Sequence, residues 1–183
     1  MSADPAFRVL GSSTLCDAGF LSLSRQRVAG PDGEEFDRHV VHHPGAVVVV
    51  PVVDGEALMV RQWRVATGRV LLEVPAGKRD VDGEAPEATA NRELAEEIGF
   101  HAHRLERLCE FYNSPGFCDE YTHLFLATDL EPRPRAAVSA EEAAMTIERV
   151  ALDRVDELIA TGEIVDAKSI IGLLLARRFL AGG

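Results

Sequence analysis

Three glutamates that a helix would bring together constrain the fold of this chain most. They are Glu93, Glu96 and Glu97, and at about 100° per residue an α-helix places them within an arc of about 100°. Pro86 favours the first turn of a helix, and Gly99 favours the position just past its end. The sequence therefore predicts a helix from about residue 86 to residue 98, with one apolar face and one acidic face.

The acidic face predicts a site for hard divalent cations. Like charges three or four residues apart destabilise a helix by a few tenths of a kcal/mol per pair, and only Arg92 lies close enough in sequence to offset them. Mg²⁺ and Mn²⁺ favour carboxylate and water ligands and commonly bridge to the phosphates of a substrate. A solvated acidic face is the alternative interpretation, but the defined helix ends favour a cation site and a phosphate-containing substrate.

The residues around this helix resemble the Nudix box, a pattern of glycines, glutamates and an arginine at fixed spacing. The matching positions are Gly77, Glu84, Arg92, Glu93, Leu94, Glu96, Glu97, Gly99 and Phe100. One feature departs from the pattern, because six residues separate Gly77 from Glu84 where the family has five. The resemblance implies a Nudix hydrolase with an α/β/α sandwich and a mixed sheet.

Composition excludes several other functional classes. The formal net charge of −11 argues against a nucleic-acid partner. No apolar run of about 18 residues is present, so we expect no membrane span, and the N-terminus lacks the layout of a signal peptide. The three cysteines, Cys16, Cys109 and Cys118, lack the spacing of a zinc site. We therefore expect a reduced, cytoplasmic protein.

The order of the expected elements favours an α+β fold. Alternating residues and a turn at 29–33 predict an N-terminal hairpin or small sheet. We expect this β region to cover residues 1–43 and to form a dimer contact, and a catalytic domain to cover residues 44–183. Pro51 predicts a bulge or an edge position in its strand. The expected strands are 46–53, 57–63, 70–74, 104–112, 121–128 and 146–151, and the later helices are 153–160 and 167–180.

Segments outside the box resemble the ADP-ribose pyrophosphatase subfamily of Nudix hydrolases. A Gln-aromatic-Arg strand precedes a Glu-x-Pro-Ala-Gly loop, and a Ser-Pro-Gly turn follows the box. Exposed strand arginines and an ordinary turn are the alternative interpretations. For Phe20 a place in the core is the preferred interpretation, and stacking on adenine, as in the subfamily that the chain resembles, is the alternative. The substrate-binding residues that the resemblance implies are Arg64, Gln62, Arg38, Glu73, Pro115, Gly116, Glu120 and Phe20.

The resemblance also implies the metal ligands and the catalytic groups. Mg²⁺, or Mn²⁺ in its place, would be held by Glu93, Glu96, Glu97 and the backbone carbonyl of Ala76. Arg92 would orient these carboxylates. Glu142, on a loop expected before the last strand, would accept the proton from the attacking water. Glu141, Glu120 or a glutamate of the box are the alternative bases.

We therefore expect Mg²⁺-dependent hydrolysis of ADP-ribose to AMP and ribose 5-phosphate by a homodimer. The rival substrates are GDP-mannose, NADH, FAD and diadenosine polyphosphates, because base and sugar pockets are assembled from distant loops. A rival class is a Nudix module that senses nucleotides without cleaving them. A related isomerase needs cysteine and glutamate placements that this sequence does not evidently supply.

Overall fold

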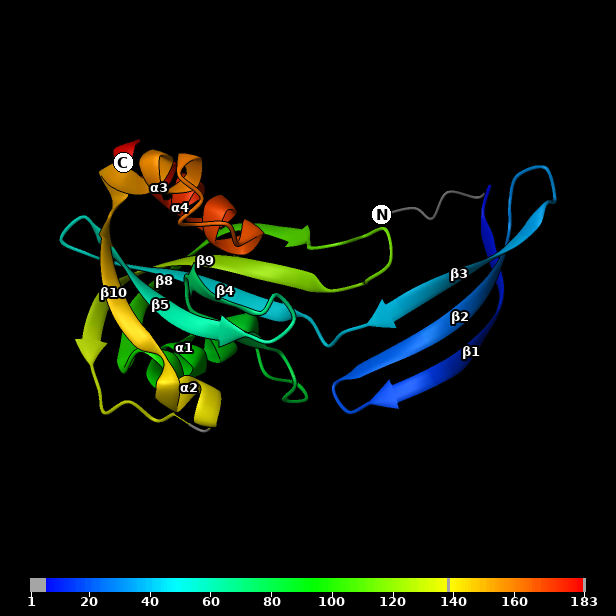
Figure 1. Ribbon diagram of the computed structural model, residues 1–183, viewed down its shortest axis with the longest axis horizontal. Coiled ribbons are helices and arrows are strands. Elements are labelled where there is room, and N and C mark those ends of the chain that lie inside the picture. Colours follow the sequence, from blue (N-terminus) through cyan, green and yellow to red (C-terminus); the bar gives the residue numbers. More distant parts are fainter. Residues whose placement is uncertain (1–5, 138, 183) are drawn as a thin grey trace. The chain divides into compact units, whose positions relative to one another are not determined.

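The computed structural model describes residues 6–137 and 139–182 (Figure 1). Within them the chain forms two compact units. Unit 1 runs up to Gly45 and includes the segment Tyr112–Tyr121, and unit 2 comprises Ala46–Phe111 and the chain from Thr122 onward. In these described ranges, no helix combines the length and apolarity that a membrane span requires. The domain boundary expected between residues 43 and 44 stays a prediction.

Unit 1 is built on a three-stranded antiparallel sheet in the order β1-β2-β3, which confirms the expected N-terminal β-structure. Its strands are β1 (Arg8–Ala18), β2 (Leu21–Ala29) and β3 (Glu35–His42). The segment Tyr112–Tyr121 lies along β3, since Val41 N donates to Phe117 O at 2.8 Å and Asp119 N donates to Val41 O at 3.1 Å. This segment carries the Ser-Pro-Gly turn.

Unit 2 contains a seven-stranded sheet in the order β10-β5-β4-β9-β8, with β6 paired to β5 and β7 paired to β4. Strands β4 and β9 run parallel, whereas β5 pairs antiparallel with β4, β6 and β10, so the sheet is mixed as expected. The strands are β4 (Ala46–Val53), β5 (Glu56–Arg64), β6 (Arg69–Glu73), β7 (Ala76–Lys78), β8 (Phe100–Tyr112), β9 (Tyr121–Pro132) and β10 (Thr146–Ala151).

Helices cover both faces of this sheet, with α1 on one face and α3 and α4 on the other (Figure 1). The α+β expectation and the α/β/α sandwich are thereby confirmed. The helices are α1 (Pro86–Glu97), α2 (Ala140–Ala144), the 3₁₀ turn η1 (Leu152–Arg154), α3 (Val155–Ala160) and α4 (Ala167–Ala181).

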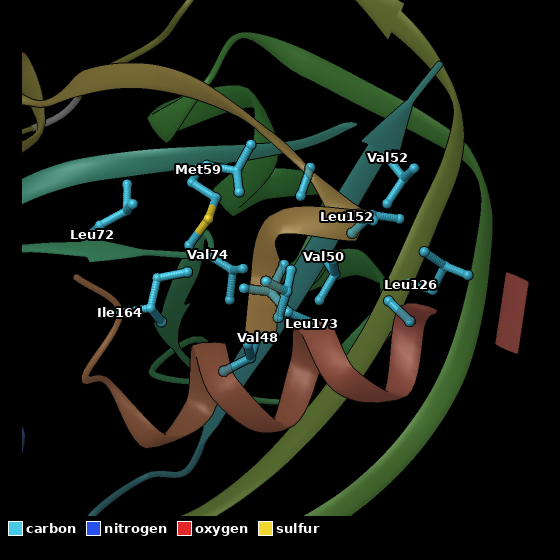
Figure 2. Packing of buried hydrophobic residues seen from close by; sticks show 14 of the residues in the cluster. Val48, Val50, Val52, Met59, Leu72, Val74, Leu126, Leu152, Ile164 and Leu173 are labelled. Atoms are coloured by element: carbon cyan, nitrogen blue, oxygen red, sulfur yellow. The ribbon is translucent and has the colours of Figure 1, made fainter. Parts of the chain in front are cut away.

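The continuous apolar run of β4 follows from this two-sided packing. Val48 and Val50 belong to the core cluster that includes Leu173 of α4, and Figure 2 shows these side chains pointing toward one another. Val47 and Val49 point to the opposite face and pack in the cluster that includes Leu94 of α1. Burying a valine side chain contributes about 1.5–3 kcal/mol, so β4 anchors both layers.

Pro51 does not occupy the expected edge position, because β4 is central in the sheet and Pro51 pairs with Ala127 of β9. The strand that pairs with this edge of β4 changes beside Pro51, from β7 to β5. Val52 pairs with β5, whereas Val49 N donates to Pro75 O at 2.9 Å, in the segment that leads into β7. A residue without an N–H suits this change of partner, since it cannot donate to a ladder.

Helix α1 has the ends that the sequence predicts. Pro86 lies at its first turn and Ile98 is the C-terminal cap. Gly99 follows with φ of 71°, a left-handed conformation, and a Cβ at this position would lie 2.9 Å from Arg133 O. Glycine is therefore required both by the backbone angle and by the close approach of the chain after β9.

Candidate functional site

Two of the three glutamates on the acidic face of α1 are buried, which argues against the alternative of a solvated acidic face. The exposed fractions of Glu93 and Glu97 are only 7% and 4%, and Glu96 is partly buried. The reason is β7, which packs on α1. An ideal Cβ on Gly77 would lie 1.8 Å from Glu93 Cδ, so the glycine leaves the space that this carboxyl group occupies.

Burial changes the acidity of both carboxyl groups. It raises the pKa of Glu93 to about 7, an effect that Arg92 opposes and Glu96 reinforces. It raises the pKa of Glu97 to about 8, with the charge of Glu93 adding to the effect and the N–H of Ala76, 3.2 Å from Oε2, opposing it. Adjacent buried acids with raised pKa values are typical of functional sites.

Arg92 is the cation that this cluster contains. Its Nη1 lies 2.7 Å from Glu93 Oε1 and 3.2 Å from Glu96 Oε2. Its Nη2 donates to Lys78 O at 3.2 Å, and Glu84 faces the same guanidinium at 3.4 Å. The structure thus brings the glutamate side chains Glu84, Glu93 and Glu96 together around Arg92.

The chemistry of the donors fits a hard divalent cation, because carboxylate and backbone oxygens are the ligands that such ions prefer. Glu93 and Glu97 are two buried carboxyl groups, and the positive charges that offset them are Arg92 for Glu93 and Arg64 for Glu97. However, the part of the chain that is described holds no group of three or more His, Cys, Asp or Glu side chains arranged to hold a metal ion. Arg92 Nη1 instead bridges two of the expected ligands.

A bidentate ion pair lies on β5 and β6. Arg64 Nε and Nη2 each donate at 2.7 Å to one carboxylate oxygen of Glu73, whose exposed fraction is 1%. Gln62 is two residues earlier on β5, with an exposed fraction of 6%, and its Nε2 has no hydrogen-bond partner among the described residues. Glu73 therefore holds Arg64 in place. The buried Nε2 of Gln62 is a hydrogen-bond donor that suits an acceptor on a ligand.

Glu142 lies on the short helix α2 rather than on the expected loop. The Oγ of Ser139 caps this helix by accepting from Glu142 N at 3.1 Å. The negative charge of Glu142 contributes to the raised pKa values of both Glu93 and Glu97. Glu142 is partly buried, whereas Glu141 is exposed.

Arg135 fixes α2 to α1, a role that the sequence did not indicate. Its guanidinium donates to the backbone carbonyls of Glu142, Met145 and Glu96, the last two at 3.2 and 3.4 Å. The sequence signal was weak, because Arg135 ends a proline-rich stretch in which only the prolines stand out. Its contacts bridge segments about forty residues apart.

The remaining substrate-binding residues expected from the sequence belong to unit 1. Three of them, Arg38, Pro115 and Gly116, line a cavity of about 470 Å³ together with Tyr112 and Phe117. This cavity lies between β3 and the Tyr112–Tyr121 segment.

Phe20 and Glu120 are not among the residues that line this cavity. The exposed fraction of Phe20 is 49%, so the preferred interpretation, a place in the core, is wrong. Its ring packs edge-on against His43 with centroids 5.7 Å apart. Glu120 is partly buried, and its backbone oxygen accepts from Asn113 N at 3.3 Å.

Comparison with known proteins assigns the family. Residues 41–171 match the NUDIX domain. The ADP-ribose pyrophosphatase of Bacillus subtilis (strain 168) is 41% identical over 150 residues, which cover 81% of this chain and 80% of the relative. The ADP-ribose pyrophosphatase of Mycobacterium tuberculosis H37Rv is 38% identical over 181 residues, which cover 98% of this chain and 87% of the relative.

The fold agrees with a solved structure. The crystal structure of an ADP compounds hydrolase superposes with a TM-score of 0.86 over 100% of this chain and 98% of that chain, at 24% identity. The chain therefore belongs to the Nudix family. Nudix hydrolases generally need a divalent metal, in agreement with the donor types on α1.

Proposed function

We propose that this chain is an ADP-ribose pyrophosphatase, which hydrolyses the diphosphate bond of ADP-ribose to AMP and ribose 5-phosphate. The observation that carries the proposal is the pair of buried carboxyl groups of Glu93 and Glu97, held beside β7 on a helix of the Nudix family. Relatives with 38% and 41% identity that bear this activity in their names support the substrate.

Mg²⁺ is the cofactor in this proposal. Glu93, Glu96, Glu97 and the backbone carbonyl of Ala76 would hold the ion. When bound, it neutralises charge on the diphosphate and orients the diphosphate for attack by water. Arg92 would release Glu93 and Glu96 to the ion and keep its contact with Glu84.

Glu142 is the general base in this proposal. Its carboxylate accepts a proton from the attacking water while the new P–O bond forms, and the bridging P–O bond breaks with its electron pair passing to the leaving phosphate. Arg135 holds the backbone of α2, so the position of the Glu142 backbone, from which its side chain extends, is fixed. Glu141, which is exposed, is the nearest alternative in sequence.

Arg64 and Gln62 are the donors that we assign to substrate oxygens in unit 2. A guanidinium held through Nε and Nη2 by the carboxylate of Glu73 loses little further freedom when it binds a phosphate. The unpaired Nε2 of Gln62 costs about 1–3 kcal/mol while it is buried without an acceptor. A substrate oxygen would remove that cost, which favours a role in binding for this amide.

The cavity in unit 1 has the size of a small-molecule site, since such sites commonly have volumes of about 300–1,000 Å³. Arg38, Pro115 and Gly116 are the residues that we assign to substrate binding there. Tyr112 and Phe117 add two aromatic rings, which suit a nucleobase. Phe20 and Glu120 stay in the proposal as further substrate-binding residues of unit 1.

We also propose a homodimer that uses the exposed sheet of unit 1. Strand β1 is exposed along its full length, and it carries Val9, Leu10 and Leu15 with their side chains in solvent. An exposed edge strand with apolar residues favours pairing with a second copy. Light scattering coupled to size exclusion should give the mass of two chains, and Leu15→Glu should shift it toward one. A wild-type monomer would refute the dimer.

The three cysteines are free. Free thiols persist in a reducing compartment, so we place the protein in the cytoplasm.

AMP release from a substrate panel tests the activity. We expect the highest kcat/KM with ADP-ribose rather than with GDP-mannose, NADH, FAD or diadenosine polyphosphate, and no turnover in EDTA. Glu97→Gln should remove most activity, whereas the matched control Glu157→Gln, on the exposed side of α3, should keep it. A higher kcat/KM for another substrate would reassign the specificity. Tight binding without turnover would identify a sensing module instead.

A further inference from the structure

Two arginines close the loop between β7 and α1, which is one residue longer than the family pattern. Glu84 N donates to Val81 O at 3.2 Å and forms a turn. Arg79 Nη2 then donates to Glu84 O at 3.4 Å, and Arg92 Nη2 donates to Lys78 O at 3.2 Å. One guanidinium therefore holds the end of the loop and the other holds its beginning.

Arg79 also reaches across to His123 of β9. Its Nη1 lies 3.3 Å from His123 Nε2, and His123 Nδ1 lies 2.7 Å from Glu110 Oε1. A guanidinium can only donate hydrogen bonds. Nε2 is therefore the accepting nitrogen, and the ring proton is on Nδ1, from which it is donated to Glu110.

The contacts continue through β8 and return to α1. Arg107 Nη1 donates to Glu110 Oε1 at 3.0 Å, and its Nη2 donates to Glu87 Oε1 at 2.8 Å, in the first turn of the helix. All of these residues belong to unit 2. The loop ahead of the acidic helix is thus attached to two strands of the sheet and, through them, to the start of the helix.

At the other end, the loop determines where Arg92 lies. The carboxylate of Glu84 accepts from Thr89 Oγ1 at 2.8 Å and faces Arg92 at 3.4 Å. Arg92 in turn contacts Glu93 at 2.7 Å. A displacement of Glu84 would therefore move Arg92 and, with it, the carboxylates of the helix.

A contribution to the stability of the fold does not by itself explain the position of Arg79. Its Nε is buried and has no hydrogen-bond partner in the described ranges. A buried donor without an acceptor costs about 1–3 kcal/mol. Despite this cost, the guanidinium lies where Nη1 contacts His123 and Nη2 donates to Glu84 O, so it links the two residues.

We propose that Arg79 and His123 are positioning residues for the carboxylates of α1. They hold the lengthened loop against β9, so that the carboxylate of Glu84 keeps Arg92 in contact with Glu93. The inference rests on the proposed divalent-cation site, but neither residue is one of its ligands. A partner that orients metal ligands from outside commonly changes metal affinity by about 10–100-fold when it is removed.

Binding of Mn²⁺ alone, followed by electron paramagnetic resonance without substrate, tests this role. We expect Arg79→Met to weaken Mn²⁺ binding by about tenfold, and Arg79→Lys to restore part of the affinity. The control Arg104→Met removes an arginine from the exposed surface of β8, where it pairs with Glu106, and should leave the affinity unchanged.

A second pair of variants separates position from packing. His123→Gln keeps an acceptor at the place of Nε2 and should bind Mn²⁺ within about twofold of the wild type, whereas His123→Leu should lose about as much affinity as Arg79→Met. A structural role alone would lower the melting temperature of the metal-free variants without changing the Mn²⁺ dissociation constant.

Four outcomes would each refute the positioning role, the cation site or the proposed substrate. Wild-type affinity in both Arg79→Met and His123→Leu would overturn the positioning role. Equal loss in His123→Gln and His123→Leu would also overturn it, because the acceptor would then not matter. No Mn²⁺ binding by the wild type would refute the cation site itself. Failure to hydrolyse ADP-ribose would refute the proposed substrate and leave the Mn²⁺ result standing.

Discussion

Replacing Gly77 with alanine should separate the chemistry of the site from the stability of the fold. The φ of Gly77 is not in the left-handed region, so the backbone accepts alanine. The new Cβ would lie 1.8, 2.0 and 2.2 Å from the three carboxyl atoms of Glu93. Ordinary van der Waals contact begins at 3.4 Å, so the carboxyl group must move by about 1.6 Å, the difference between 3.4 and 1.8 Å.

This displacement predicts a large loss of activity. A misplacement of about 1 Å in a catalytic site can lower the rate about 100-fold, which corresponds to about 2.7 kcal/mol of transition-state stabilisation. The fold should change little, because the side chain of Glu93 can rotate away and a compatible Gly→Ala change stabilises a protein by about 0.4–1 kcal/mol.

The assay combines AMP release from ADP-ribose, Mn²⁺ binding and thermal unfolding. Gly77→Ala should lower kcat about 100-fold and weaken Mn²⁺ binding, while its melting temperature stays close to that of the wild type. Gly11→Ala is the matched control, since no atom lies within 4 Å of its added Cβ. Wild-type kcat and Mn²⁺ affinity in Gly77→Ala would refute the placement of Glu93 as a metal ligand.

Three further predictions concern single carboxylates and an ion pair. In the folded, metal-free protein, burial raises the pKa of Glu97 from the usual 4.5 to about 8. The stability that protonated Glu97 contributes is therefore complete below pH 4.5 and is lost as the pH rises through 8. The melting temperature in EDTA should therefore fall from pH 4.5 to pH 8, and Glu97→Gln should flatten this dependence; an unchanged slope would contradict the burial argument. Glu142→Gln should lower kcat by a factor of about 100 to 10,000 with a modest change in KM, and a larger loss in Glu141→Gln would transfer the role of the base. Arg64→Met leaves the buried carboxylate of Glu73 unpaired and should cost about 2 kcal/mol in urea unfolding, a value reduced because Arg64 is partly exposed. The double variant with Glu73→Leu should recover stability but keep a raised KM for ADP-ribose, whereas recovery of KM would remove Arg64 from substrate binding.

Local chemistry explains why the elements of unit 2 could be predicted. Pro86 and Gly99 define the ends of α1 by backbone rules that need no distant partner. The apolar run of β4 predicts a buried strand for the same reason. The edge position predicted for Pro51 is wrong, because a missing N–H is also compatible with a central strand whose neighbour changes.

The candidate site was predicted less completely. The box residues could be recognised from spacing, but periodicity assigns a residue to a helix face without indicating what packs on that face. The burial of Glu93 depends on β7, and the pairing of Arg64 with Glu73 depends on the β5–β6 register. The role of Arg135 depends on contacts with two remote backbone segments.

Helix α1, its carboxylates and the family could be read from the amino-acid sequence, because they follow from short-range geometry and from the spacing of particular residues. The acidity of Glu93 and Glu97 required the folded structure, since burial beside β7 raises their pKa values. The folded structure alone joined Arg79 to His123, which lie 44 residues apart. Electrostatics and packing depend on distances in space, and the folded chain sets those distances between residues that the sequence leaves far apart.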